Sequence, residues 1–165
     1  MSLLKGIGVT LRTATDEPSD PAGTDDHLYI GLIGTSGGRE FPLDAEDHED
    51  FETGSMRKYS LGKTINFVDP NTSFPRESEE GGVNDPGFMP IIMEQVFFVY
   101  LRKQDSEGED DAYRVRNLDV VLYGDQENTR TYHLNLRGQG PWLSTVNGQV
   151  VYLTLVPDPP GIGAA

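Results

Sequence analysis

Apolar side chains recur at every second position in several short runs of this chain, and that period constrains its fold more than any other feature. In the first run Ile7, Val9 and Leu11 alternate with smaller or polar residues, as in a strand with one buried face. We expect strands in eight such segments: Ile7–Leu11, Leu28–Leu32, Arg39–Leu43, Arg57–Leu61, Val96–Leu101, Val115–Leu122, Tyr132–Leu136 and Val151–Leu155. No long window shows an apolar stripe at helical spacing. The pattern therefore predicts an all-β fold, an antiparallel β-sandwich of two sheets.

The run Val96–Leu101 (VFFVYL) is apolar at consecutive positions, which predicts a strand in the middle of a sheet. The 19 glycines and 11 prolines agree with many short elements joined by turns. We expect a single domain over residues 1–156, followed by a flexible tail at 157–165. Residues 63–90 lack periodic apolar positions and are too long for an ordinary connection, so we expect an inserted loop there.

The chain is strongly acidic, with a formal net charge of −14. Six of the nine residues from Asp44 to Glu52 are acidic, as are five of the seven from Asp105 to Asp111. Such a surface repels nucleic acid and anionic membranes, whereas divalent cations and basic proteins complement it. The acidic runs have two interpretations: they are solvated loops that keep the protein soluble, or they pool carboxylates at one end of the sandwich.

Known catalytic templates are missing from the sequence. There is no cysteine, which excludes disulfides, thiolate metal sites and thiol catalysis. Phosphate-binding glycine loops, the HExxH zinc motif and the GxSxG nucleophile turn are also missing. A hydrolase that uses clustered acids stays open as an alternative, but we expect a protein that is not an enzyme. No signal-peptide pattern or membrane-spanning apolar stretch is recognisable, so we expect a cytoplasmic protein, or one exported as part of an assembly.

Two adjacent carboxylates, Asp25 and Asp26, stand at the start of the second predicted strand. Their mutual repulsion would be relieved by a cation, and loops rich in Asp, Glu, Thr and Gly offer the oxygen ligands that calcium prefers. Gly23, without a Cβ atom, would allow a backbone carbonyl to turn towards the ion. A plain turn before a strand explains Gly23 and Thr24 equally well.

The same residues carry a resemblance to a known family. Ala22–Asp25, followed by the strand Leu28–Ile30 and by Gly34, resembles the AGTDxxVYIxLxG hallmark of PLAT (lipoxygenase-homology) domains. Asp50–Ser55 (DFETGS) is similar to the NxFERGS turn of that family. Weaker similarities continue in the family's order through Tyr59–Gly62, Leu101–Asp105, Tyr113–Leu122 and Gly140–Leu143, with residues 63–90 as an extra insertion.

The resemblance implies an eight-stranded β-sandwich used as a binding module, often with calcium in loops at one end. Carried over by position, it implies nine metal ligands: Asp16, Asp20, Gly23, Thr24, Asp25, Asp50, Glu52, Gly54 and Asp105. Asp25 is then the expected ligand, and Asp26 a neighbour that faces solvent. Arg57 stands where the family often has another acid, which removes one ligand or replaces it by a cation.

Two functions follow for a chain of this kind. The first is calcium-assisted docking to a protein or lipid surface, with a protein partner and, through calcium, a membrane lipid as the expected targets. The second is a structural or accessory subunit of a larger assembly, without metal, that uses residues 63–90 as a docking arm. Neither involves nucleic acid, and the sequence does not specify an oligomeric state.

Overall fold

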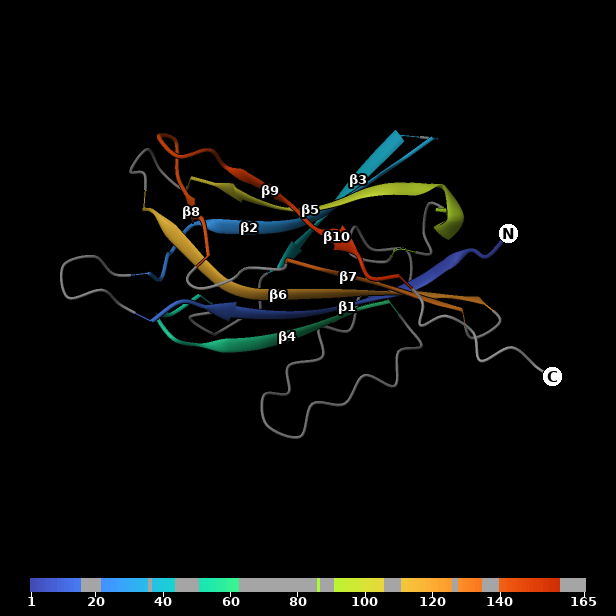
Figure 1. Ribbon diagram of the computed structural model, residues 1–165, viewed down its shortest axis with the longest axis horizontal. Helices are drawn as coiled ribbons and strands as arrows, with labels where there is room; N and C mark the ends of the chain where they lie inside the picture. Colours follow the sequence, from blue (N-terminus) through green and yellow to red (C-terminus); the bar gives the residue numbers. More distant parts are fainter. Residues whose placement is uncertain are drawn as a thin grey trace.

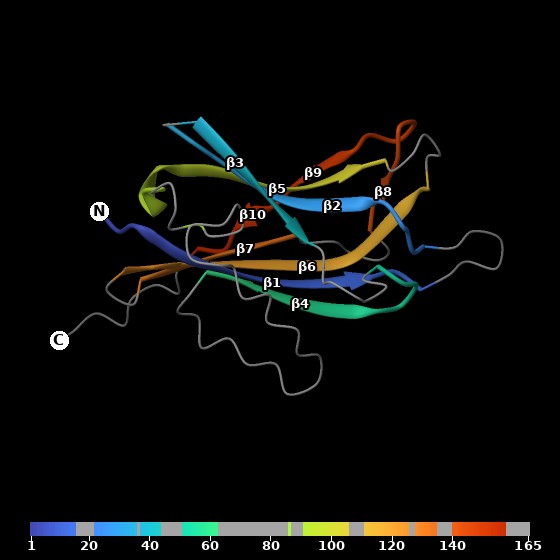
Figure 2. The ribbon, with the colours of Figure 1, turned by 180° about the vertical axis from the view of Figure 1, so that it is seen from behind.

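The computed structural model is an all-β sandwich of two antiparallel sheets (Figure 1). It describes residues 1–15, 22–35, 37–43, 51–62, 86, 91–105, 111–125, 128–134 and 140–157. Seen from behind, the two layers again lie one above the other, with β4 at an outer edge (Figure 2). The predicted fold class is therefore confirmed.

The described residues form ten strands and one short 3₁₀-helix. One sheet has six strands in the order β10-β7-β6-β1-β4, with β8 paired to β6, and the other has four in the order β3-β2-β5-β9. The elements are β1 (Leu4–Thr13), β2 (His27–Gly34), β3 (Gly37–Leu43), β4 (Met56–Leu61), η1 (Met93–Gln95), β5 (Val96–Gln104), β6 (Tyr113–Gly124), β7 (Thr129–His133), β8 (Trp142–Leu143), β9 (Val150–Tyr152) and β10 (Thr154–Leu155).

The core lies between the two layers and is built from the alternating positions of the strands. In β1, Ile7 and Val9 are fully buried, and Val9 pairs with Tyr59 of β4 on one side and Val120 of β6 on the other. In the facing sheet, Leu101 of β5 is equally buried. Because strand side chains alternate between faces, the period of two in the sequence translates directly into this shared core.

Most predicted strands are confirmed, but two need correction. The segment Val151–Leu155 is not one strand: β9 pairs with β5, and β10 pairs with β7 of the other sheet. The segment at Tyr132–Leu136 lies earlier than expected, because β7 spans Thr129–His133. The short strand β8 was not expected from the sequence.

The chain passes from one sheet to the other at Leu153. Its amide donates to the carbonyl of Val99 in β5, and three residues later the amide of Val156 donates to the carbonyl of Thr131 in β7. Leu153 itself is buried between the layers. One continuous segment thus supplies a border strand to both sheets.

The prediction of a single domain over 1–156 with an inserted loop at 63–90 stays a prediction. Apart from Pro86, whose carbonyl accepts a hydrogen bond from Arg39 of β3, residues 63–90 lie outside the described part of the chain. The predicted tail lies outside it too, except for Pro157. Within the described residues, the structure contains no helix of the length and apolar character that crossing a bilayer requires.

The core position of Leu101 leads to a direct test of the sandwich. Replacement Leu101→Ala leaves a cavity between the sheets, so we expect the free energy of unfolding to fall by about 2–5 kcal/mol. Val146→Ala is the control, because Val146 is 88% exposed, and its effect should stay within about 0.5 kcal/mol. Urea denaturation followed by circular dichroism measures both, and equal losses for the two variants would contradict the proposed core.

Candidate functional site

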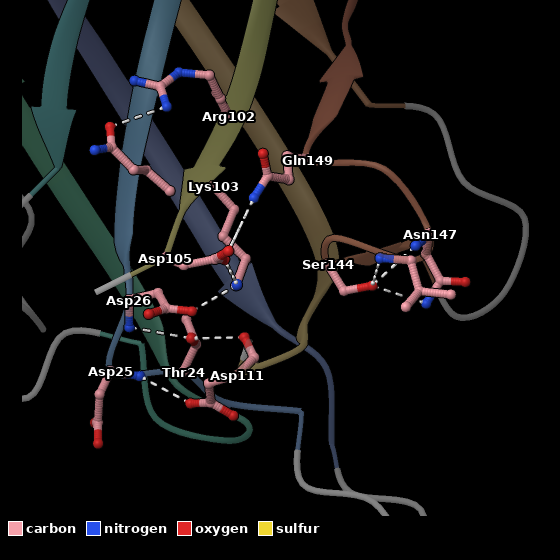
Figure 3. Close-up of polar contacts among 12 residues, drawn as sticks. Thr24, Asp25, Asp26, Arg102, Lys103, Asp105, Asp111, Ser144, Asn147 and Gln149 are labelled. Carbon is pink, nitrogen blue, oxygen red and sulfur yellow. Dashed lines mark hydrogen bonds and ion pairs between the residues drawn. The ribbon is translucent and has the colours of Figure 1, made fainter. Parts of the chain in front are cut away.

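The connections that resemble the family's metal loops meet at one end of the sandwich. Strands β1 and β5 finish there, and β2, β4 and β6 begin there (Figure 1). We call this region the loop end and define it by residues 22–26, 51–55, 105 and 111. The close-up shows part of it (Figure 3).

Two backbone amides of the first loop donate hydrogen bonds to the second loop. The amide of Gly23 donates to the Thr53 hydroxyl at 3.1 Å, and the amide of Thr24 donates to the carbonyl of Phe51 at 3.2 Å. A Cβ atom on Gly23 would lie 2.8 Å from that carbonyl oxygen, closer than real Cβ atoms approach. Gly23 is therefore needed because the second loop passes directly over it. These two contacts hold the first and second loops side by side.

A tight turn shapes the second loop. The amide of Ser55 donates to the carbonyl of Glu52 at 2.9 Å, and Gly54 between them has φ +70°, a value that favours glycine. The amide of Gly54 donates in turn to the carbonyl of Ala14 at the end of β1. The turn leaves the Glu52 side chain exposed to solvent.

Below this turn, two aromatic rings anchor the second loop to the core. Phe51 packs edge-on against Tyr113, with ring centroids 6.1 Å apart, and Tyr113 is fully buried. Burial raises the pKa of the Tyr113 phenol well above its usual value, so its hydroxyl stays protonated beside Thr13, 3.2 Å away. The second loop is therefore fixed both by its hydrogen bonds to the first loop and by the packing of Phe51 on the core.

A third connection reaches the first loop through Asp111. The Thr24 hydroxyl donates to the Asp111 carbonyl and accepts a hydrogen bond from the amide of Asp26, both at 3.1 Å. The amide of Asp25 donates to the Asp111 carboxylate at 3.1 Å (Figure 3). The Thr24 hydroxyl is thus used in hydrogen bonds within the protein. Asp111 is a neighbour that the motif comparison did not identify.

The two adjacent aspartates have opposite environments. Asp25 is exposed and its carboxylate points away from the cluster, whereas Asp26 is buried and forms an ion pair with Lys103 at 2.5 Å (Figure 3). The expectation that Asp26 faces solvent is wrong. Its burial follows from strand geometry, because Asp26 has the same parity as the inward-facing Leu28 and Ile30.

The cation beside Asp26 is a buried lysine of the same chain. Lys103 is completely buried, and its ammonium group contacts both Asp26 and, at 2.7 Å, Asp105. Gln149 completes the group: its side-chain amide lies 3.3 Å from both carboxylate oxygens of Asp105, and its carbonyl accepts from the amide of Lys103. Lys103 has the same parity as the buried Leu101, which is the sequence signal that identifies it as an inward-facing residue.

Of the nine predicted metal ligands, the structure brings five into the two joined loops: Gly23, Thr24, Asp25, Glu52 and Gly54. Asp105 lies in the adjoining ion cluster, while Asp16, Asp20 and Asp50 lie outside the described residues. In the part of the chain that the structure describes, no three histidine, aspartate or glutamate side chains are grouped so as to hold a metal ion. The donors at hand, Asp25 and Glu52, are the right type for calcium but do not complete a site by themselves.

Arg57, the residue at the expected acidic position, lies in β4. It pairs with Leu11 of β1 and so occupies the inward-facing register shared by Tyr59 and Leu61. The structure thus assigns Arg57 to a strand bordering the second loop rather than to the loop itself.

Comparison with known proteins supports the PLAT-like fold. The sequence matches no family model and no curated protein significantly. Solved structures with a similar fold include the alpha toxin from Clostridium absonum, at 20% identity and a TM-score of 0.58, over 92% of this chain and 32% of the toxin. The Clostridium perfringens alpha-toxin from avian strain SWCP is 18% identical, with a TM-score of 0.56, over 93% of this chain and 32% of the toxin.

A third similar structure is the coral 8R-lipoxygenase, described as activated by calcium through a C2-like domain. It is 16% identical, with a TM-score of 0.52, and the match covers 91% of this chain but 17% of the lipoxygenase. The chain thus spans a third or less of the length of each of these proteins. At such identities the similarity extends to the fold alone.

The contrast between the adjacent aspartates can be measured. Asp26→Asn removes one of the two carboxylates that pair with the buried ammonium of Lys103, while Asp105 remains, so we expect the free energy of unfolding to fall by about 1–3 kcal/mol. Asp25→Asn, one residue away but exposed, should change it by no more than about 0.5 kcal/mol. Urea midpoints at neutral pH measure the difference, and a larger effect at Asp25 would contradict the ion cluster described above.

Proposed function

We propose that this chain is a non-catalytic binding module whose loop end docks on a protein or lipid surface, with calcium assisting. The observation that carries the proposal is the pair of exposed carboxylates, Asp25 and Glu52, on two loops that backbone hydrogen bonds hold together. Two loops joined in this way, with exposed acids, suit a cation that offsets their local negative charge and bridges to an anionic partner.

The internal ion cluster limits which groups can serve calcium. Asp26 and Asp105 are already engaged in ion pairs with Lys103, and the hydroxyl of Thr24 already donates one hydrogen bond and accepts another. Asp25 and Glu52, with backbone carbonyls of the two loops, are therefore the described groups best suited to hold the ion. When bound, calcium would supply positive charge at an otherwise acidic surface. The loops would hold the ion at that surface, away from the core.

Three further considerations support this proposal. Coral 8R-lipoxygenase, which has a similar fold over this chain, is described as activated by calcium through a C2-like domain. The net charge of −14 makes a cation the natural intermediary between this protein and an anionic surface, since like charges otherwise repel. The absence of catalytic templates from the sequence supports a binding role rather than catalysis.

The alternative is an accessory subunit that docks through residues 63–90 without metal. Almost all of that segment lies outside the described residues, so this role stays a prediction. It differs from the proposal in a measurable way, because its partner binding would be independent of calcium and would be lost on deletion of the segment.

Calcium should stabilise the folded protein if the loop end binds it. A ligand at 100 times its dissociation constant adds about 2.7 kcal/mol to the free energy of unfolding. For a chain of this size, 1 mM calcium acting on a site with a dissociation constant of about 10 µM should therefore raise the melting temperature by about 5–10 °C. Magnesium at the same concentration should raise it less, because its smaller ion demands a stricter geometry.

Matched variants show whether the effect arises at the loop end. Asp25→Asn and Glu52→Gln should each reduce the calcium-dependent shift while leaving the calcium-free melting temperature unchanged. Lys5→Gln, an exposed change in β1 away from the loop end, is the control. Sedimentation with phosphatidylserine vesicles, with and without calcium, then separates a lipid target from a protein target. An unchanged melting temperature and a flat calorimetric titration at millimolar calcium would exclude the proposed role of the ion.

A further inference from the structure

The outer face of the four-stranded sheet carries a set of aromatic side chains that neither the core nor the loop end uses. Phe98 and Tyr100 occupy the outward positions of β5, and Tyr152 of β9 pairs with Tyr100. Phe98 is 54% exposed and Tyr152 is 58% exposed. We call Phe98, Tyr100 and Tyr152 the aromatic face. Large apolar groups gathered on a surface usually mark an interaction site.

The three rings form one contiguous group. Tyr152 packs edge-on against both Phe98 and Tyr100, with ring centroids 5.9 Å apart in each case. Mutual packing of this kind fixes the orientation of each ring before any ligand arrives. The group is therefore preorganised rather than a set of independent mobile side chains.

A glycine in the neighbouring strand lets the central ring lie on the sheet. Gly31 of β2 pairs directly with Tyr100, and a Cβ atom at Gly31 would fall 1.9 Å from Cζ of the tyrosine ring. The ring thus occupies the space above Gly31 where any other residue would place its side chain. The sheet surface at this point consists of an aromatic ring supported by backbone.

An irregularity in β5 presents a further aromatic residue to solvent. Ile33 pairs with Phe98 and Gly34 with Val96, so Phe97 is an extra residue in the strand, as in a β-bulge. Phe97 is 60% exposed, and two consecutive phenylalanines are therefore exposed where a regular strand would turn one of them inward. Bulges commonly re-aim side chains in this way at functional sites.

A fixed polar network borders the rings. Nε and Nη2 of Arg102 donate to the two carboxylate oxygens of Glu40 at 2.6 and 2.7 Å, and the hydroxyl of Tyr100 donates to the same carboxylate at 2.9 Å. Nη1 of Arg102 donates to the side chain of Gln104 at 3.1 Å. The guanidinium group also covers the ring of Tyr29, 4.4 Å from its centroid.

The protonation states of this network are well defined. Hydrogen bonds from Arg102 hold the pKa of Glu40 below its usual value, so its carboxylate remains ionised at neutral pH. Burial and the neighbouring Glu40 raise the pKa of Tyr100 to about 12, so its phenol keeps its proton. Because the charges of Arg102 and Glu40 cancel, the polar border of the aromatic face carries no net charge.

We propose that the aromatic face binds a neutral carbohydrate chain. The apolar C–H faces of sugar rings would pack on Phe98, Tyr100 and Tyr152, and sugar hydroxyl groups would hydrogen-bond to the remaining lone pair of the Glu40 carboxylate and to the side chain of Gln104. Such a ligand is apolar on its ring faces and rich in hydroxyl groups at its edges, which is the chemistry that the rings and their polar border present together.

Charge favours a neutral carbohydrate over the other candidate ligands of the aromatic face. The protein has a net charge of −14, so an anionic membrane, a nucleic acid or a second copy of the chain meets long-range repulsion. A neutral polysaccharide does not. The polar border consists of paired charges and neutral groups and has no excess of negative charge. A highly basic protein would therefore find no complementary charge on this face.

This inference is independent of the proposed calcium-assisted docking, because the aromatic face lies on the sheet and not on the loops. Carbohydrate binding should therefore persist in EDTA. Failure of the calcium experiment would leave it intact, and failure of the carbohydrate experiment would leave the calcium proposal intact.

The test is affinity electrophoresis of the full chain in native gels that contain EDTA and one neutral polysaccharide each. The panel comprises glycogen, laminarin, xyloglucan, galactomannan and arabinoxylan, with co-sedimentation on insoluble cellulose and chitin. We expect retardation or co-sedimentation with at least one member. The double variant Phe98→Ala/Tyr152→Ala should weaken the affinity by about tenfold or more, as removal of aromatic anchors does at other interfaces.

Controls separate loss of binding from loss of fold. Both substituted rings are more than half exposed and pack on neighbouring surface rings, so the double variant should stay folded with a melting temperature at most a few degrees lower. Val146→Ala, an exposed aliphatic change outside the aromatic face, should bind normally. Glu40→Gln keeps the three rings but removes the charged acceptor, and it should weaken binding while leaving the chain folded.

Three outcomes would overturn the inference. One is a lack of interaction with every member of the panel, and another is equal binding by the double variant and the unchanged chain. The third is that the double variant instead abolishes calcium-free sedimentation with phosphatidylcholine–phosphatidylserine vesicles or a dimer seen in analytical ultracentrifugation. That result would assign the aromatic face to lipid or to a second copy of the chain.

Discussion

The completely buried ammonium group of Lys103 determines how the loops at one end of the sandwich are arranged. A charge removed from water costs several kcal/mol unless a partner is fixed beside it, and here Asp26 and Asp105 are those partners. Lys103 lies opposite Leu28 in the β2–β5 register, so the first loop has to enter β2 with Asp26 facing inward. Successive residues of an extended chain point to opposite sides, and Asp25 is therefore directed to solvent. The exposed acid at the loop end is in this sense a consequence of the buried one.

Much of the fold could be predicted from the sequence, because a period of two identifies strands and their buried faces. The same period would also have distinguished the two aspartates, since Asp26 has the parity of Leu28. The resemblance to the family's motif instead assigned Asp26 to solvent, because it identifies expected ligands and not the direction of each side chain. The contact between Asp26 and Lys103 depends on which strands pair and in which register, and that is set by the whole sandwich rather than by either local segment. The position of Asp111 beside Thr24 is a tertiary property of the same kind.

The split of Val151–Leu155 illustrates a different limit of sequence analysis. Val151, Leu153 and Leu155 keep a regular alternation, which correctly predicts extended backbone. Alternation indicates which side of a strand faces the core but not which sheet the strand joins, and here the chain changes sheets at Leu153. Similarly, the doubly apolar run in β5 correctly predicts a strand between two neighbours, yet its outward residues face solvent rather than a second core. Within that run the core takes up Val99 and Leu101, whereas Phe98 faces outward and is 54% exposed.

The crossover at Leu153 has a consequence for how the molecule avoids unwanted self-association. Strands at the border of a sheet expose unpaired backbone groups and can recruit a strand from another molecule. On this side of the sandwich the border is divided between the three residues of β9 and the two residues of β10. An incoming strand would find only two or three residues to pair with before the template turns into the other layer. Resistance to edge-to-edge polymerisation is thus supplied here by the path of the chain, in addition to the charge repulsion between acidic molecules.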